Sequence, residues 1–296
     1  MKQTIFTGSG VAIVTPMNPD GSVSYEVLRE LINLQIADGT DAIVICGTTG
    51  ESSTLSDEEH IELIHFAVMC AKGRVPVIAG AGSNDTAYAV HMSKAAKDAG
   101  ADALLHVTPY YNKTSQAGLI RHFNTIADAT DLPVILYNVP SRTGVNILPA
   151  TYRELAKHPN IVATKEACGN VAQIAETMTL CGDDLDLYSG DDTLIVPLLS
   201  LGAKGVISVL SNVLPKATHD ICRFFFEGNV GESLALQLRY FPLIKALFCD
   251  VNPIPVKEAM NIMGHPCGSC RSPLCDLSSE QRGLLVNTMR EAGIIQ

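Results

Sequence analysis

The chain has 296 residues, of which 47% are hydrophobic and only 18% are charged, and its formal net charge is -10 at pH 7. This composition, without low-complexity tracts, excludes a disordered protein and favours a compact, heavily buried fold. The negative charge disfavours binding to nucleic acids and to anionic membranes. No apolar run approaches the length of a bilayer span, so we expect a soluble, cytoplasmic protein.

The nine cysteines lie mostly in apolar or helical segments, which is typical of reduced thiols packed as small hydrophobic groups. Only Cys267, Cys270 and Cys275, with His265 nearby, resemble a cluster of metal ligands. Because this stretch lacks the second cysteine pair of a typical zinc site, we expect loop cysteines and no metal. A zinc site there stays open as the alternative.

Short apolar segments rich in β-branched residues alternate with helical patterns, at intervals of about 25 to 30 residues. Eight such units follow one another along the chain. Strands that are apolar on both faces and alternate with helices predict a parallel sheet, and eight units favour a closed (β/α)8 TIM barrel. The expected strands are Gly10–Thr15, Ala42–Cys46, Val75–Ala79, Ala103–Val107, Val134–Asn138, Ile161–Lys165, Asp186–Ser189 and Gly205–Val209.

Helix starts are marked by residues that commonly cap helices. They are Ser24, Ser56 with Glu59, Asn84 or Asp85, and Ser115. Beyond about Leu214 the pattern continues as a helical tail, which the prolines of Asn252-Pro-Ile-Pro255 interrupt. We therefore divide the chain into a barrel of residues 1–224 and a C-terminal helical extension of residues 225–296.

One charged residue, Lys165, ends the predicted buried strand that begins at Ile161. Active sites of parallel barrels lie at the carboxyl ends of the strands. Burial disfavours the ammonium form of a lysine, which makes the free amine available to attack a carbonyl. The alternative is a structural lysine that is neutralised by Glu166 or another carboxylate.

Other strand ends carry groups that suit the same chemistry. The glycines around Thr48 and Thr49 let backbone amides turn toward an anion. Tyr137 ends a strand, and Arg142 follows it on a loop, which offers a proton donor beside a carboxylate clamp. An amine, a phenol and an anion clamp at one end of a barrel are what a Schiff-base aldolase acting on a 2-oxo acid and an aldehyde requires. The full set is Thr48, Thr49, Tyr111, Tyr137, Arg142 and Lys165.

These motifs, in order and spacing, resemble the 4-hydroxy-tetrahydrodipicolinate synthase (dihydrodipicolinate synthase) family of class I pyruvate-dependent aldolases. The resemblance extends over nearly the whole chain, and it implies condensation of pyruvate with aspartate semialdehyde in lysine and diaminopimelate biosynthesis, with no cofactor. The matching motifs are Gly47-Thr-Thr-Gly-Glu51, Thr108-Pro-Tyr-Tyr-Asn112, Tyr137-Asn-Val-Pro-Ser-Arg-Thr-Gly144, Lys165-Glu-Ala167, Ser189-Gly-Asp-Asp192, Gly205-Val-Ile-Ser208 and Asn252-Pro-Ile-Pro-Val-Lys257.

The resemblance also implies a role for each site residue. Lys165 would form the Schiff base with pyruvate, and Tyr137, Thr48 and Tyr111 would form a proton relay. The pyruvate carboxylate would be bound by Thr49 with main-chain groups at Gly190 and Ile207, whereas Arg142 would hold aspartate semialdehyde. Family members are usually homotetramers built from two tight dimers, in which the tyrosine that matches Tyr111 enters the neighbouring subunit's site.

In lysine-inhibited members the effector lies at the dimer interface. The matching positions here are Ser52, Ser53, Leu55, His60, Asn84 and Tyr110. Two positions depart from that pattern, because Asp57 replaces a histidine and Tyr88 replaces the glutamate that meets the effector's amine. Inhibition by lysine therefore stays an open question.

Two other functions are compatible with this barrel. A lyase for sialic acids or 2-keto-3-deoxy sugar acids would use the same amine chemistry, but we would then expect a polyol-binding loop in place of Arg142. A catalytically inactive binding protein is the second alternative, and the intact set of motif residues argues against it.

Overall fold

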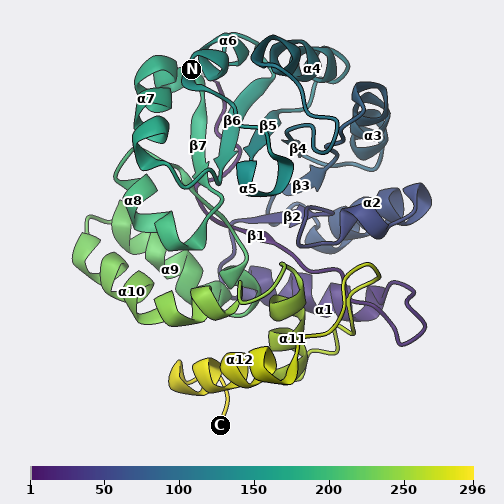
Figure 1. The fold of residues 1–296 in the computed structure, drawn as a ribbon, viewed down its shortest axis with the longest axis vertical. Coiled ribbons are helices and arrows are strands. Elements are labelled where there is room, and N and C mark those ends of the chain that lie inside the picture. Colours follow the sequence, from purple (N-terminus) through teal and green to yellow (C-terminus); the bar gives the residue numbers. More distant parts are fainter. Residues whose placement is uncertain (1) are drawn as a thin grey trace.

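The computed structural model describes residues 2–296 and contains a closed barrel of eight parallel strands in sequential order (Figure 1). The predicted TIM barrel is therefore confirmed. The strands are β1 (Gly8–Ala12), β2 (Ala42–Ile45), β3 (Val77–Gly80), β4 (Ala103–Val107), β5 (Val134–Asn138), β6 (Ile161–Glu166), β7 (Asp186–Ser189) and β8 (Gly205–Ser208).

The largest error in the predicted strands concerns the first, which begins at Gly8 and ends at Ala12 instead of running from Gly10 to Thr15. Beyond Ala12 the chain leaves the regular ladder, because the amide of Val14 donates to the side chain of Asn212 at 3.1 Å. A hydrogen bond to a distant side chain has no signature in the local apolar pattern, so the sequence did not predict this strand end.

In residues 2–296, twelve α-helices and four short 3-10 helices connect the strands or follow them. The helices are α1 (Tyr25–Ala37), α2 (Asp57–Ala71), α3 (Thr86–Asp98), α4 (Gln116–Asp128), α5 (Pro140–Thr143), α6 (Pro149–Leu155), α7 (Val171–Cys181), α8 (Ile195–Leu199), α9 (Pro215–Phe226), α10 (Val230–Ala246), α11 (Ile254–Ile262) and α12 (Ser279–Glu291). The 3-10 helices are η1 (Ser52–Thr54), η2 (Gly182–Asp184), η3 (Asp192–Leu194) and η4 (Leu210–Asn212).

The predicted helix starts are confirmed in position, although not all of the caps form. Ser56 and Glu59 form a complete capping box on α2, and Asp85 and Ser115 accept amide hydrogen bonds at the starts of α3 and α4. Ser24 precedes α1 but makes no capping hydrogen bond with its side chain. Asp85 therefore caps α3 in place of the alternative residue before it.

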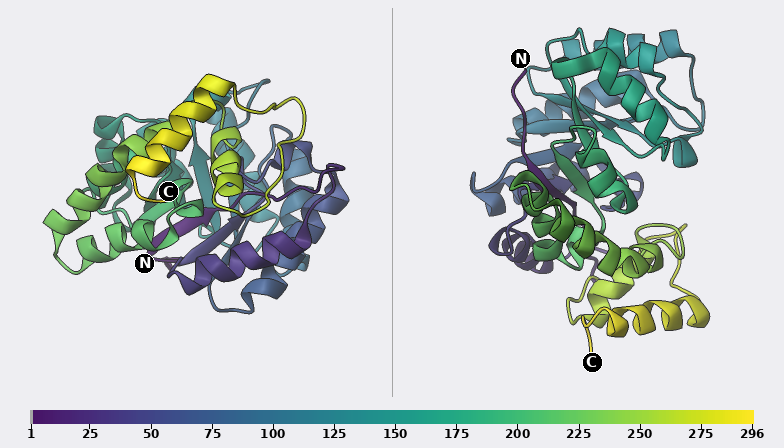
Figure 2. Two further views of the ribbon diagram at one scale, coloured as in Figure 1. Left: turned by 90° about the horizontal axis from the view of Figure 1, so that it is seen from below. Right: turned by 90° about the vertical axis from the view of Figure 1, so that its left-hand side faces the viewer.

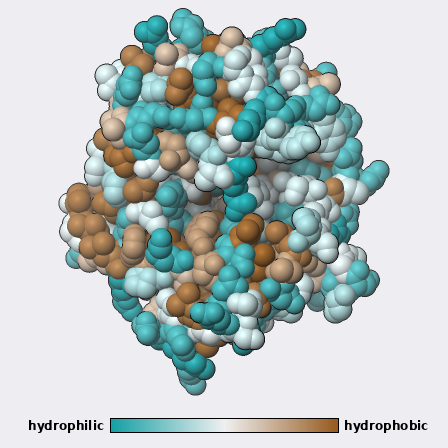
Figure 3. Space-filling model, viewed as in Figure 1, coloured by the Kyte–Doolittle hydropathy of each residue, from teal (hydrophilic) through white to brown (hydrophobic). Residues whose placement is uncertain are grey.

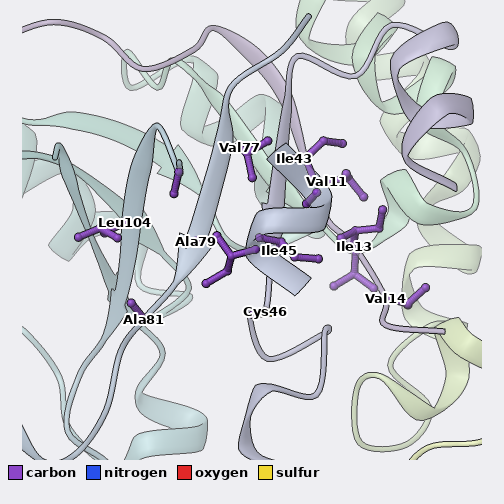
Figure 4. Close-up of a cluster of buried hydrophobic side chains, with 14 of the residues drawn as sticks. Val11, Ile13, Val14, Ile43, Ile45, Cys46, Val77, Ala79, Ala81 and Leu104 are labelled. Carbon is purple, nitrogen blue, oxygen red and sulfur yellow. The ribbon is translucent and has the colours of Figure 1, made fainter. Parts of the chain in front are cut away.

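The barrel strands separate two apolar layers because successive side chains point to opposite faces. The outer layer lies between the strands and the helices and includes Ile43 and Ile45 of β2 together with Val77 and Ala79 of β3 (Figure 4). The inner layer fills the barrel with residues of the opposite parity, among them Val44. This alternation decides which side chains at the strand ends can face the barrel interior.

The helices after β8 have two different relationships to the barrel. Helix α9 packs on β1 and β8, whereas α11 and α12 form a group at the end of the molecule opposite to α4 and α6 (Figures 1 and 2).

The predicted boundary between residues 224 and 225 lies within α9, and this division into two parts stays a prediction. None of the helices in residues 2–296 combines the length and apolar composition that crossing a membrane requires.

A buried ion pair fastens the C-terminal helices to the loop that follows β2. Lys257 of α11 donates to Oε1 of Glu51 at 2.8 Å, and both side chains are almost fully buried. The second carboxylate oxygen of Glu51 accepts from the backbone amide of Arg271 at 2.8 Å. Glu51 therefore joins α11 and the loop before α12 to the segment that carries Thr48 and Thr49.

We predict that Lys257→Met lowers the free energy of unfolding by about 3 to 5 kcal/mol, because it leaves the Glu51 carboxylate buried without its partner. Urea unfolding followed by circular dichroism measures this loss. The matched control is Lys216→Met, which breaks an exposed pair with Asp220 and should cost under about 1 kcal/mol. Equal effects of the two substitutions would contradict a structural role for the buried pair.

Candidate active site

Lys165 and Tyr137 lie side by side on neighbouring strands at one end of the barrel. They are paired in the register between β5 and β6. Each residue shares its face of the strand with an inner-layer residue two positions earlier, Ala163 for Lys165 and Ile135 for Tyr137, so both side chains face the barrel interior. The Lys165 Nζ lies 4.3 Å from the centre of the Tyr137 ring.

The Lys165 amine has the environment that a nucleophile requires. The residue is 6% exposed, and burial lowers the pKa of its ammonium group to about 8, an effect that Asp192 opposes and Arg142 reinforces. Lys165 takes part in none of the ion pairs of residues 2–296, and strand alternation turns the neighbouring Glu166 to the other face of β6. The alternative of a structural lysine neutralised by its neighbour Glu166 is therefore not what the structure contains.

Tyr137 is buried, and burial raises the pKa of its phenol, whereas Arg142 and the Thr48 hydroxyl lower it. The phenol therefore keeps its proton at neutral pH and can donate it. Tyr137 and Thr48 line one small cavity together, between the loop after β2 and the end of β5. Thr48 thus lies on the same side of the barrel as the amine and the phenol.

The structure also places the four predicted substrate-binding residues at the carboxyl ends of strands. Thr49 is buried in the loop that follows β2, and Arg142 is exposed on α5, which follows β5. Gly190 follows β7, and a Cβ built on it would lie 3.0 Å from Cγ of Lys165, so a larger residue there would press on the lysine stem. Ile207 lies buried in β8.

Tyr111 is the one predicted relay residue that the single chain does not bring into the site. It is 91% exposed on the loop after β4, and its backbone φ of 66° lies in the left-handed region that non-glycine residues rarely adopt. The adjacent Tyr110 is 39% exposed. The chain therefore presents two tyrosine rings to its surroundings at the mouth of the barrel.

A cavity of about 400 Å³ opens beside this mouth and contains most of the predicted effector positions. Asn84 lies outside its lining, although its side chain donates to the carbonyl of Tyr110 at 3.1 Å. Asp57 and Tyr88 hydrogen bond to each other across the cavity's rim, with the Tyr88 hydroxyl donating at 2.5 Å. The effector positions in the lining are Ser52, Ser53, Leu55, His60 and Tyr110, together with Thr48 and Arg142 of the predicted site.

Two buried polar residues that contact or influence the predicted site residues were not themselves predicted as site residues. The Oδ2 of Asp192 accepts from the amides of Val209 and Leu210 at 3.0 and 2.8 Å, and its charge favours the ammonium form of Lys165. Asn252, beyond α10, contacts both Thr49 and Arg142. Both residues belong to motifs that carry the family resemblance, but neither the effect of Asp192 on Lys165 nor the contacts of Asn252 follow from the sequence alone.

The cysteine cluster near the C-terminus is not arranged as a metal site. Cys267 is buried, Cys270 is half-buried and Cys275 is exposed. Across residues 2–296 no group of three or more His, Cys, Asp or Glu side chains is placed to hold a metal ion. All nine cysteines are free thiols.

Comparison with known proteins places this site in a defined family. The model of the dihydrodipicolinate synthetase family matches residues 5–292. The 4-hydroxy-tetrahydrodipicolinate synthase of Lachnoclostridium phytofermentans is 58% identical over 98% of this chain and 99% of its own length.

Two solved structures have nearly the same fold, each covering 99% of this chain and 100% of its own. The chloride-inhibited dihydrodipicolinate synthase from Acinetobacter baumannii, complexed with pyruvate, has a TM-score of 0.96 at 46% identity. The enzyme from Cyanidioschyzon merolae with lysine bound has a TM-score of 0.96 at 42% identity.

The barrel, the buried amine beside a phenol and the full-length matches lead to one assignment. The activity is that of 4-hydroxy-tetrahydrodipicolinate synthase, EC 4.3.3.7, a lyase that acts in lysine biosynthesis. This chain therefore belongs to the dihydrodipicolinate synthetase family.

Proposed function

We propose that Lys165 attacks the keto carbon of pyruvate and forms a Schiff base, and that the enamine derived from it adds to the aldehyde of aspartate semialdehyde. The observation that carries this proposal is the position of the Lys165 amine, which is buried, unpaired within residues 2–296 and 4.3 Å from the Tyr137 ring. An amine with a pKa near 8 retains a useful free fraction at neutral pH.

Tyr137 is the proton donor and acceptor in this proposed reaction. Expulsion of water from the carbinolamine needs a proton donor, and loss of a methyl proton from the iminium needs an acceptor. The phenol lies beside the nitrogen and is protonated at rest, so it donates first and accepts afterwards. Thr48, which lines the same cavity, passes the proton on toward Tyr111.

The two substrates are held by different residues. Thr49, with main-chain groups at Gly190 and Ile207, binds the pyruvate carboxylate. Arg142 is exposed at the mouth of the barrel, where a second, larger substrate arrives, and its guanidinium binds the carboxylate of aspartate semialdehyde. A sugar-acid lyase would need polyol contacts at this position, so the arginine favours the synthase reaction.

We propose further that the protein is a homotetramer in which Tyr111 completes the relay of a neighbouring subunit. Two separate exposed apolar surfaces support this arrangement, because a dimer of dimers needs two kinds of interface. One is formed by the tyrosines after β4. The other is a stripe on α10, visible as brown residues at the left edge of Figure 3. The stripe consists of Val230, Leu234, Leu238 and Phe241. A sedimentation mass of a single chain would contradict this assembly.

The effector cavity, in our proposal, does not bind lysine. The hydroxyl of Tyr88 is already engaged with Asp57, and the residues that line the cavity include no carboxylate. An ammonium group of lysine would therefore lose a charge-assisted partner, worth about 1.5 to 3 kcal/mol.

The nine free cysteines support a location in the cytoplasm, where thiols stay reduced.

Borohydride reduction with pyruvate should attach one pyruvate-derived group to Lys165, detected by peptide mass spectrometry. Because the ammonium form dominates below a pKa of about 8, the rate of trapping should fall about tenfold for each pH unit below that value. Lys165→Arg keeps the positive charge and should give no adduct. Labelling of a different lysine in the native enzyme would overturn the proposal.

Arg142→Ala should leave the pyruvate adduct unchanged but lower kcat/KM for aspartate semialdehyde by roughly 10- to 150-fold, because a charge-assisted hydrogen bond to its carboxylate is lost. Arg142→Lys should recover only part of the loss, since a lysine cannot bind a carboxylate with two parallel hydrogen bonds. A coupled assay that varies each substrate separately makes the distinction. Equal damage to both steps would show that Arg142 is not a clamp for the second substrate.

Lysine at millimolar concentration should leave the activity of the native enzyme unchanged. The double variant Asp57→His and Tyr88→Glu restores the pattern of the inhibited relatives and should bind lysine roughly 10- to 150-fold more tightly than the native chain does. Isothermal titration calorimetry and the coupled assay report on binding and inhibition. Strong inhibition of the native enzyme would show that the cavity finds another partner for the amine.

A further inference from the structure

Asn252 connects the C-terminal helices to both substrate-binding groups. It lies between α10 and α11 and is 5% exposed. Its side-chain Nδ2 donates to Oγ1 of Thr49 at 3.0 Å, and its backbone carbonyl accepts from Nη2 of Arg142 at 3.1 Å. One residue outside the ring of strands therefore contacts the hydroxyl and the guanidinium that we assign to the two carboxylates.

The direction of the bond to Thr49 determines what the hydroxyl can do. A threonine hydroxyl has one proton and two lone pairs. The amide of Asn252 occupies a lone pair, and Thr49 Oγ1 donates to no other group in the described part of the chain. The proton is therefore free to bind an incoming anion, and a hydrogen bond to a charged acceptor is stronger than one to a neutral acceptor.

The other polar atom of the Asn252 side chain, Oδ1, gives no reason for an asparagine at this position. Its Oδ1 is buried and has no hydrogen-bond partner among residues 2–296. A buried polar atom without a partner is unfavourable, so a residue needed only for packing would be apolar. The contact with Thr49 is the one that makes use of the amide side chain.

We propose that Asn252 is a positioning residue for pyruvate: it holds the Thr49 hydroxyl with its proton directed at the pyruvate carboxylate. This inference rests on the proposed role of Thr49. The contact with Arg142 is made by the backbone, so a change of the Asn252 side chain leaves it in place. The side chain should therefore matter for pyruvate and not for aspartate semialdehyde.

The test compares Asn252→Ala with Asn252→Asp in steady-state assays that vary each substrate. Loss of one hydrogen bond in the alanine variant should raise KM for pyruvate about fivefold, with kcat and the KM for aspartate semialdehyde unchanged. The aspartate variant keeps the shape but accepts the Thr49 proton and adds a negative charge, so its KM for pyruvate should rise further. A structural role predicts the reverse order, because aspartate fills the space that alanine leaves empty.

A double-mutant cycle with Thr49→Val isolates the coupling. Once the hydroxyl is absent, Asn252→Ala should have no further effect on KM for pyruvate. Asn261→Ala is the control, because Asn261 also hydrogen bonds within the C-terminal helices, to Gly268, but lies outside the site. It should leave KM for pyruvate unchanged.

The outcomes separate the two proposals. Additive effects in the cycle, or a native-like Asn252→Asp enzyme, would overturn the inference about Asn252. A Thr49→Val enzyme with native KM for pyruvate would instead overturn the role of Thr49. If Asn252→Ala fails to fold, as thermal melting would show, the aspartate variant still carries the test because it replaces the donor by an acceptor in a side chain of nearly the same shape.

Discussion

In the proposed mechanism, the function of this barrel depends on keeping one amine out of water. Lys165 is enclosed by the inner layer of the barrel, and the cost of burying its ammonium form lowers the pKa to about 8. Asp192 limits this shift, because its negative charge favours the ammonium. A lysine with a much lower pKa would be a weaker nucleophile, and one with its ordinary pKa would be almost fully protonated. The balance of burial and Arg142 against Asp192 therefore sets how much free amine is present.

The carboxyl ends of the strands supply the reactive groups, but the C-terminal helices help to position them. Glu51 joins the loop after β2 to α11 through Lys257, and Asn252 reaches Thr49 and Arg142 from the segment before α11. These contacts connect parts of the chain that are 110 to 206 residues apart in sequence. The C-terminal helices thus hold residues of the site in position, and the barrel without them would lack these contacts.

The sequence predicted the barrel because its buried strands repeat with helices between them, and it predicted Lys165 and Tyr137 because each ends such a strand. Those signals are local. The roles of Asn252 and Asp192 depend on contacts across the barrel, and no local pattern predicts which distant amide or carboxylate folds beside a threonine or a lysine. The end of β1 was missed for the same reason, since a side chain of η4 accepts the amide of Val14. Sequence reasoning therefore located the groups at the strand ends better than it located their distant hydrogen-bond and charge partners.

In the proposed assembly, Tyr111 connects the chemistry of one chain to a neighbouring subunit. Tyr111 is 91% exposed, so its ring makes few contacts within its own chain, and its backbone φ of 66° costs conformational free energy. The surrounding loop holds the backbone in this conformation. Burial of the ring against another subunit would offset the free energy that the strain costs. In that arrangement the proton relay from Tyr137 through Thr48 would end on a residue from a neighbour. Association would then control activity directly, because a separated chain would keep its nucleophile and its carboxylate clamps but lose the last member of the relay.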